Sequence, residues 1–180
     1  MRPDLLVHPV RPEDADALGA LTAAAYLDGG ILAPDDPYVT ELRDVATRMR
    51  ETIVLAAYRG RRVVGGITLV APGSSYAEVG RDGEMELRML AVDPAAQRQG
   101  VAEALLGASA ETAEELGFDA IVLSTMDVMP AAHRLYTRLG LERVPERDWT
   151  GDWDPEAVAA GTAPLLSVYR LPVPARLHRS

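Results

Sequence analysis

Hydrophobic positions along the chain follow two different periods, which predicts a mixture of helices and strands. Apolar residues recur every three to four positions, as on one face of a helix, in segments 13–28, 38–50, 100–116 and 130–140. Apolar runs bounded by Gly, Pro or Asp predict strands at 5–10, 53–58, 63–70, 84–92, 119–124, 141–144 and 165–171. The predicted order of elements is therefore β-α-α-β-β-β-α-β-α-β-β.

This order indicates an α/β fold with a mixed sheet. The turn Arg59-Gly60-Arg61 joins two predicted strands directly, which is typical of an antiparallel hairpin. Helices separate later strands, and such crossovers are typical of parallel pairs. A length of 180 residues is ordinary for one domain. We therefore assign residues 1–172 to a single domain and 173–180 to a C-terminal tail.

Composition excludes several kinds of chemistry. The chain has 18 basic and 27 acidic residues, for a net charge of −9, and every basic residue is arginine. Because cysteine is absent, disulfides, thiolate nucleophiles and cysteine-ligated metals are excluded. Because lysine is absent as well, Schiff-base enzymes and phosphate-loop NTPases are excluded.

Charge and hydropathy also limit the partners. An acidic chain lacks the basic surface that sequence-independent nucleic-acid binding needs, whereas it suits a cationic substrate. The three histidines show no metal-ligand spacing, so we expect no metal site. The longest uncharged run, 63–77, is interrupted by glycine and proline, so we expect no membrane span. The first residues lack the pattern of a signal peptide, which favours a cytoplasmic location.

The segment that carries chemistry is the strand 84–92 together with the helix start that follows it. Free backbone N–H groups at a helix start, aided by the helix dipole, bind phosphate oxygens. Gly100 has no Cβ and Ala102 has a small side chain, so a ligand can approach the backbone closely. Arg98 adds a charge that can pair with phosphate. These residues predict a phosphate or pyrophosphate site that needs no lysine.

Two motifs resemble the hallmarks of the GNAT N-acetyltransferase superfamily. The first is Gln97-x-x-Gly100-x-Ala102 after a strand that ends in Leu-Ala-Val-Asp-Pro, and it is similar to the acetyl-CoA signature Gln/Arg-x-x-Gly-x-Gly/Ala. The second is the segment from Ala132 to Leu141, which resembles Ala-x-x-Leu-Tyr-x-x-x-Gly-Phe with leucine in the last place. The resemblance implies a mixed, mainly antiparallel sheet flanked by helices.

The resemblance also implies an acetyl-CoA-dependent N-acetyltransferase, in which an amine attacks the thioester directly in a ternary complex. Leu90, Ala91 and Val92 would pair through their backbone with the pantetheine arm, like an added strand. Backbone N–H groups from 98 to 103 would hold the pyrophosphate. The cofactor-binding turn comprises Gln97, Arg98, Gln99, Gly100, Val101, Ala102 and Glu103. Dimers are common in the family, so a homodimer is a further expectation.

Catalytic roles for Glu86 and Tyr136 follow from the same resemblance. Glu86 stands where family members often place a carboxylate base, and the N–H of Leu90 would bind the oxyanion. Tyr136 matches the tyrosine that protonates the leaving thiolate, and a phenol with a reference pKa of about 10 can donate at neutral pH. Without the resemblance, Tyr136 is an ordinary amphipathic helix residue. Glu84 and Glu86 could equally form a solvated strand face, with water removing the proton of the amine.

Of two alternatives to this enzyme, the first is disfavoured by the sequence and the second stays open. Ser124, Asp127 and His133 could suggest a hydrolase triad, although no Gly-x-Ser-x-Gly turn surrounds the serine. The second alternative is a catalytically inactive acyl-CoA-binding module that acts as a sensor or interaction partner. The family often has an asparagine where this chain has Met129, which removes one side-chain hydrogen bond to the pantetheine arm.

Two loops are candidate walls of the acceptor site. One is the loop 28–37, and the other contains Trp149 and Trp153 among aspartates, which would suit a cationic amine. A packed surface loop is the alternative in both cases. The sequence leaves a polyamine, an aminoglycoside, an amino acid, a peptide N-terminus and a protein lysine as candidate acceptors.

Overall fold

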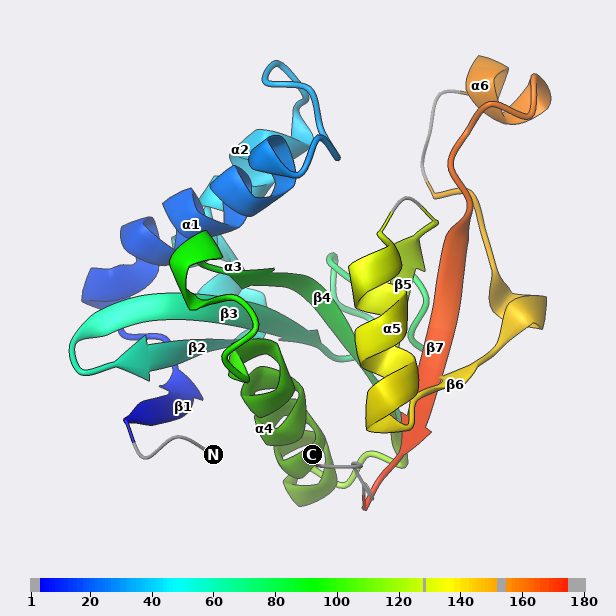
Figure 1. The fold of residues 1–180 in the computed structure, drawn as a ribbon. Coiled ribbons are helices and arrows are strands. Elements are labelled where there is room, and N and C mark those ends of the chain that lie inside the picture. Colours follow the sequence, from blue (N-terminus) through cyan, green and yellow to red (C-terminus); the bar gives the residue numbers. More distant parts are fainter. Residues whose placement is uncertain (1–3, 128, 152–154, 175–180) are drawn as a thin grey trace.

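A sheet of seven strands forms the centre of the molecule in the computed structural model (Figure 1). The structure describes residues 4–127, 129–151 and 155–174. The strands are β1 (Leu5–Pro9), β2 (Ile53–Arg59), β3 (Arg62–Val70), β4 (Glu84–Val92), β5 (Ala120–Met126), β6 (Glu142–Arg143) and β7 (Leu166–Pro172). They lie in the order β1-β2-β3-β4-β5-β7-β6, and every neighbouring pair is antiparallel except β4–β5. The predicted α/β class and mixed, mainly antiparallel sheet are confirmed.

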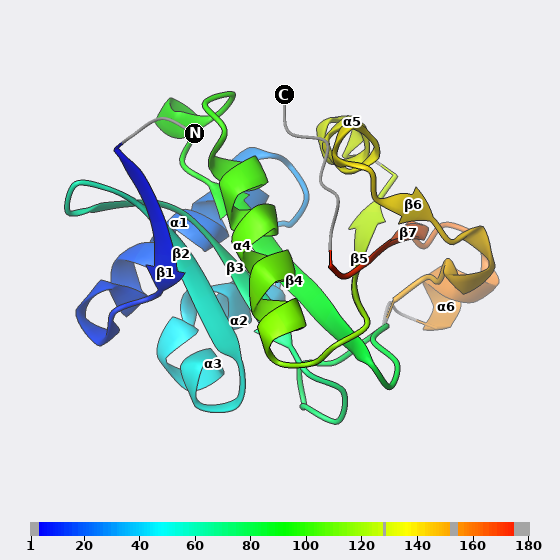
Figure 2. The same cartoon turned by 90° about the horizontal axis from the view of Figure 1, so that it is seen from below.

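Helices cover both faces of this sheet. They are α1 (Ala15–Asp28), α2 (Tyr38–Arg43), α3 (Val45–Glu51), α4 (Val101–Glu115), α5 (Pro130–Leu139) and α6 (Pro155–Ala159). Leu18 of α1 and Val45 of α3 pack with buried residues of β2 on one face. Leu105 of α4 and Leu139 of α5 belong to the larger core on the other face. Figure 2 shows α4 lying across the sheet on that second face.

The predicted helix 38–50 is two helices, because the chain changes direction at Asp44. Asp44 leaves the helical region, with φ −84° and ψ 66°, and its carboxylate accepts a hydrogen bond from the Thr47 N–H at 3.0 Å. Aspartate is a favoured residue in this N-cap position. The buried guanidinium of Arg48 donates to two carbonyls at the end of α2. The apolar spacing continues through the break, so it does not reveal the change of direction.

The feature that positions the functional site is an opening between β4 and β5. These parallel strands pair only as far as Leu87 and Leu123, although β4 continues to Val92. Just beyond the last pair, Met89 has a φ of +56° and the register between β3 and β4 shifts. A left-handed residue at such a shift is typical of a β-bulge, which bends the strand. β4 therefore turns away from β5, and in the described residues their facing edges have no strand partner beyond this point.

Candidate functional site

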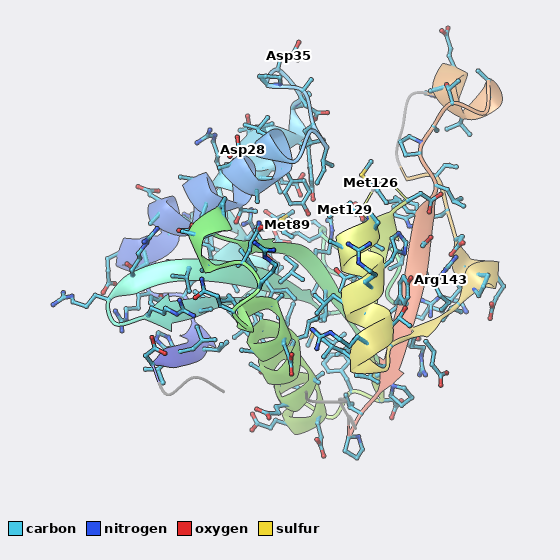
Figure 3. The ribbon with its side chains drawn as sticks, viewed as in Figure 1. Asp28, Asp35, Met89, Met126, Met129 and Arg143 are labelled. Carbon is cyan, nitrogen blue, oxygen red and sulfur yellow. The ribbon has the colours of Figure 1, made fainter. Side chains whose placement is uncertain are left out.

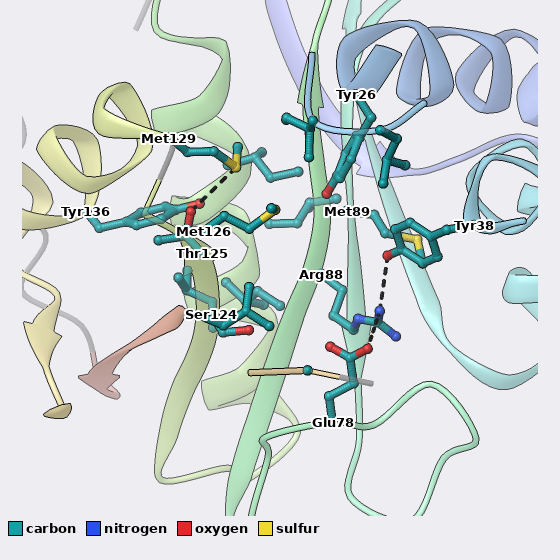
Figure 4. Close-up of a pocket in the computed structure, with 18 of the residues that line it drawn as sticks. Tyr26, Tyr38, Glu78, Arg88, Met89, Ser124, Thr125, Met126, Met129 and Tyr136 are labelled. Atoms are coloured by element: carbon teal, nitrogen blue, oxygen red, sulfur yellow. Dashed lines mark hydrogen bonds and ion pairs between the residues drawn. The ribbon is translucent and has the colours of Figure 1, made fainter. Parts of the chain in front are cut away.

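A cavity of about 370 Å³ lies in the opening between β4 and β5 (Figure 4). Its wall joins the two faces of the sheet, because Tyr136 belongs to the core under α4 and α5 whereas Met89 belongs to a cluster with α1 and α2. Met126 and Met129 gather with Met89 around the opening (Figure 3). The wall comprises Tyr26, Ile31, Leu32, Asp36, Tyr38, Ile67, Glu78, Leu87, Arg88, Met89, Leu90, Leu106, Leu123, Ser124, Thr125, Met126, Met129, Tyr136, Trp149, Gly151 and Leu166. The cavity is therefore lined from both faces of the sheet.

Tyr136 stands at the α5 end of this cavity and is buried. The helix that carries it begins at Pro130, a residue suited to the first helical position because it needs no N–H partner. The ring packs against Tyr169 with the ring centroids 5.4 Å apart, and the hydroxyl points toward Met126 and Met129 (Figure 4). Burial raises the pKa of Tyr136 above that of an ordinary phenol. The hydroxyl is therefore protonated at neutral pH and can donate a proton into the cavity.

His133 supports the packing around Tyr136 and does not form a hydrolase triad. Its Nδ1 lies 2.7 Å from the Tyr169 hydroxyl and its Nε2 lies 3.0 Å from the Met126 carbonyl oxygen, so both ring nitrogens are engaged. Asp127 accepts a hydrogen bond from a serine of β7 at 3.1 Å. In the part of the chain that the structure describes, no hydrogen bond links Ser124 to Asp127 or His133. The residues of the triad alternative are therefore not assembled for nucleophilic catalysis.

The chain enters α4 through a turn with two left-handed residues. Arg98 has a φ of +57° and Gly100, the N-cap of α4, has a φ of +82°. A Cβ added at Gly100 would meet no heavy atom within 4 Å, so the space in front of the turn is open. The first hydrogen bond into the helix runs from the Ala104 N–H to the Gly100 carbonyl at 2.9 Å. The N–H groups of 101–103 are thus available to an external acceptor, which is the arrangement that binds anions.

Side chains of the turn 97–103 have different tasks. Gln99 hydrogen-bonds to the preceding turn and to β2, so it holds the turn against the sheet. Glu103 pairs with Arg138 of α5 at 3.2 Å. Arg98 is exposed. The backbone and the Arg98 guanidinium are therefore the groups that can meet an anion here.

The carboxylates of Glu84 and Glu86 are buried, so the alternative of a solvated strand face is wrong. Glu84 pairs with Arg147 and with Arg170, at 2.8 Å in each case. Burial alone would raise the pKa of Glu84, but the hydrogen bonds from these two arginines outweigh it and lower the pKa. Glu86 accepts hydrogen bonds from the backbone N–H groups of 78, 79 and 80, at 2.8 to 3.0 Å. It is not part of the cavity wall in the described residues.

Sequence reasoning missed the charged pair that faces the cavity, Arg88 and Glu78. Arg88 Nη2 lies 2.7 Å from Glu78 Oε1 and 3.1 Å from the Tyr38 hydroxyl (Figure 4). Its Nη1 donates to the Tyr76 carbonyl at 2.8 Å. Arg88 is the third charged residue at alternate positions of an otherwise apolar strand. That run of charges could have drawn attention to Arg88, although it does not reveal Glu78 as its partner.

Both loops expected to border the acceptor reach the cavity. The wall includes Ile31, Leu32 and Asp36 from the first loop, and Trp149 and Gly151 from the second. The indole N–H of Trp149 is buried and has no hydrogen-bond partner among the described residues. Trp153 lies outside the described residues, as do residues 175–180 of the predicted tail.

Across residues 4–127, 129–151 and 155–174, no group of three or more His, Asp and Glu side chains is placed to hold a metal ion. Within the same ranges, no helix combines the length and the apolar character needed to cross a membrane.

Comparison with known sequences gives a family match that covers most of this site. The sequence model of the acetyltransferase (GNAT) family matches residues 20–141. N-acetylaspartate synthetase from Danio rerio is 40% identical over 67 residues, which are 37% of this chain and 24% of that protein. The match therefore spans about a quarter of that relative's length.

Solved structures share the fold over almost the whole chain. A structure of yncA from Salmonella typhimurium with acetyl-CoA has a TM-score of 0.69 at 18% identity and covers 94% of both chains. The ribosomal-protein-S18-alanine N-acetyltransferase from Escherichia coli has a TM-score of 0.68 at 17% identity and also covers 94% of both. A GNAT-family acetyltransferase from Staphylococcus aureus has a TM-score of 0.68 at 16% identity and covers 97% of this chain and 99% of its own. At these identities the likeness concerns the fold.

Proposed function

The chain belongs to the acetyltransferase (GNAT) family, and from this premise we propose that it transfers an acetyl group from acetyl-CoA to a primary amine by direct attack in a ternary complex. The observation that carries the proposal is the cavity through the β4–β5 opening. One side of the cavity has Tyr136. Next to it is α4, the helix whose first N–H groups are available to an anion. The other side has Tyr38, Glu78 and Arg88. Donor and acceptor would enter from opposite faces and meet beside Leu90.

The residues around α4 fit acetyl-CoA. The open space at Gly100 and the N–H groups that the helix leaves unused suit the pyrophosphate, and the exposed Arg98 can pair with it. The edge of β4 from Leu90 to Val92 suits the pantetheine arm, which would pair with it as an added strand. Met129 offers a thioether in place of an amide, so its contact with the arm is apolar.

The reaction requires two proton movements. The amine nitrogen attacks the carbonyl carbon of the thioester, a C–N bond forms, the C–S bond breaks and the thiolate departs. We assign Tyr136 as the donor that protonates this thiolate, and the N–H of Leu90 as the donor to the oxyanion. Burial raises the pKa of Tyr136, so the phenol still carries its proton when the thiolate departs. The proton of the amine leaves to water.

An amine panel distinguishes this enzyme from an inactive acyl-CoA-binding module. The panel contains spermidine, tyramine, a peptide with N-terminal alanine, and L-aspartate, the last two chosen because two relatives are named for related acceptors. We expect acetyl-CoA to raise the unfolding temperature and at least one amine to accelerate CoA release, followed with a thiol reagent. The chain has no lysine, so any acetyl-lysine found with a protein acceptor comes from that acceptor.

Stabilisation by acetyl-CoA without turnover of any amine would favour the inactive binding module. No response to acetyl-CoA in either measurement would contradict both functions. The cytoplasmic location and the homodimer stay predictions of the sequence.

A further inference from the structure

The loop between β3 and β4, residues 71–83, is held by a buried carboxylate of β4, that of Glu86. Glu86 Oε2 accepts hydrogen bonds from three successive N–H groups, those of Glu78 at 2.8 Å, Val79 at 3.0 Å and Gly80 at 3.0 Å. A Cβ at Gly80 would stand 3.2 Å from the Glu86 Cβ and 3.4 Å from Oε2. The glycine therefore lets the loop backbone come close to the carboxylate. Charge-assisted bonds of this kind are stronger than neutral ones and define the path of the loop.

A second buried acid of β4, Glu84, also holds this loop. Arg147 Nη2 donates to the Val79 carbonyl at 2.5 Å and also lies 2.8 Å from Glu84 Oε2. Glu84 Oε2 in turn accepts from the Arg81 N–H at 3.1 Å. The backbone of 78–81 is thus bonded to two carboxylates of β4 and to one arginine.

The consequence of this anchoring appears at the cavity wall. Glu78, whose N–H binds Glu86, directs its carboxylate to Arg88, and both side chains line the cavity. Arg88 is held in turn by the Tyr38 hydroxyl and by the Tyr76 carbonyl of the same loop. The charged members of the wall in the described residues are two acids, Asp36 and Glu78, against the one arginine. A cationic acceptor is favoured by that balance.

We propose that Glu86 is a positioning residue for the acceptor, and that Glu78 is the carboxylate that contacts the acceptor amine. The proposal rests on the proposed function, because it names the acceptor class of the same site: small cationic amines. Glu86 is 1% exposed and is not part of the cavity wall, so an amine in the cavity does not reach its carboxylate. Its oxygen is occupied by the loop it holds. The proton of the amine then leaves to water beside Glu78.

Three variants separate positioning from base catalysis. Glu86→Gln keeps an oxygen of the same reach for the three N–H groups but takes up no proton. Glu86→Ala removes the anchor, and Glu78→Gln removes the acceptor contact while keeping the shape of the side chain. Each is compared with the unmodified chain in two measurements: hydrogen–deuterium exchange of 76–83, and steady-state kinetics with the fastest amine of the spermidine, tyramine, alanine-peptide and L-aspartate panel.

The positioning role predicts that kcat of Glu86→Gln falls by less than about threefold, whereas loss of a general base costs about a hundredfold or more. Glu86→Ala is expected to accelerate exchange of 76–83, and Glu86→Gln to change it far less. Both Glu86→Ala and Glu78→Gln are expected to raise the KM for the amine about tenfold, with the KM for acetyl-CoA little changed.

A hundredfold loss of kcat in Glu86→Gln would overturn the positioning role and make Glu86 the base. An unchanged amine KM in Glu78→Gln, or L-aspartate as the fastest amine, would overturn the acceptor contact. If no amine is turned over, the proposed function fails, and exchange of 76–83 still decides whether Glu86 holds the loop. Equal exchange in Glu86→Ala and the unmodified chain would overturn that role.

Discussion

Replacing Tyr136 with phenylalanine is expected to lower kcat about a hundredfold, the effect of removing a general acid. The thiolate then leaves without a proton donor, while the ring still packs against Tyr169. The dissociation constant of acetyl-CoA is expected to stay the same, because the proposed contacts of its pyrophosphate and pantetheine lie on the backbone of 90–92 and 98–103. Steady-state kinetics and calorimetric titration measure the two quantities separately.

A matched control exists in the same aromatic group. Tyr169→Phe also removes one buried hydroxyl, which contacts His133 at 2.7 Å, but Tyr169 is not part of the cavity wall. It is expected to lower stability modestly and to change kcat little. If Tyr136→Phe and Tyr169→Phe behave alike, Tyr136 acts through packing and is not the acid.

The second large effect is expected at the entrance to α4. Gly100→Val places a branched side chain in the open space before the turn, on a backbone with φ +82°. A non-glycine residue in the left-handed region is strained by about 1–2 kcal/mol, and the new side chain blocks the approach of the pyrophosphate. We expect the dissociation constant of acetyl-CoA to rise at least about tenfold, as measured by calorimetric titration.

Gly117→Val controls for the strain. Gly117 has a φ of +81°, has no heavy atom within 4 Å of an added Cβ, and lies beyond the opposite end of α4. It is expected to lower the unfolding temperature by a similar amount and to leave acetyl-CoA binding intact. Equal losses of acetyl-CoA affinity in the two variants would show that the effect is strain, and that the turn does not hold the pyrophosphate.

Sequence patterns predicted the parts of the fold that depend on neighbouring residues in the chain. The apolar runs gave the strands, and the resemblance of the segments around Gly100 and Tyr136 gave the family that the comparisons show. The break at Asp44 was missed, because an N-cap aspartate does not disturb the apolar spacing on either side of it. The roles of Gly100 and Tyr136 themselves stay predictions.

The charges of β4 were beyond sequence reasoning for a different reason. Glu84 is buried because Arg147 and Arg170 neutralise it, and these partners lie 63 and 86 residues further along the chain. Alternation along one strand cannot show such partners, so it left a solvated face and a catalytic role as equal alternatives. The pair of Arg88 and Glu78 was missed in the same way, because a 13-residue loop without regular structure brings Glu78 back over the strand.

A crystal structure of the protein with CoA bound would show directly whether the thioester is placed in the β4–β5 opening. We expect the pyrophosphate to lie against the N–H groups of 98–103 and the pantetheine arm to run along β4 from Val92 to Leu90. The sulfur then lies in the β4–β5 opening, within hydrogen-bonding distance of the Tyr136 hydroxyl. CoA bound outside this opening, or a sulfur beyond the reach of Tyr136, would contradict this placement.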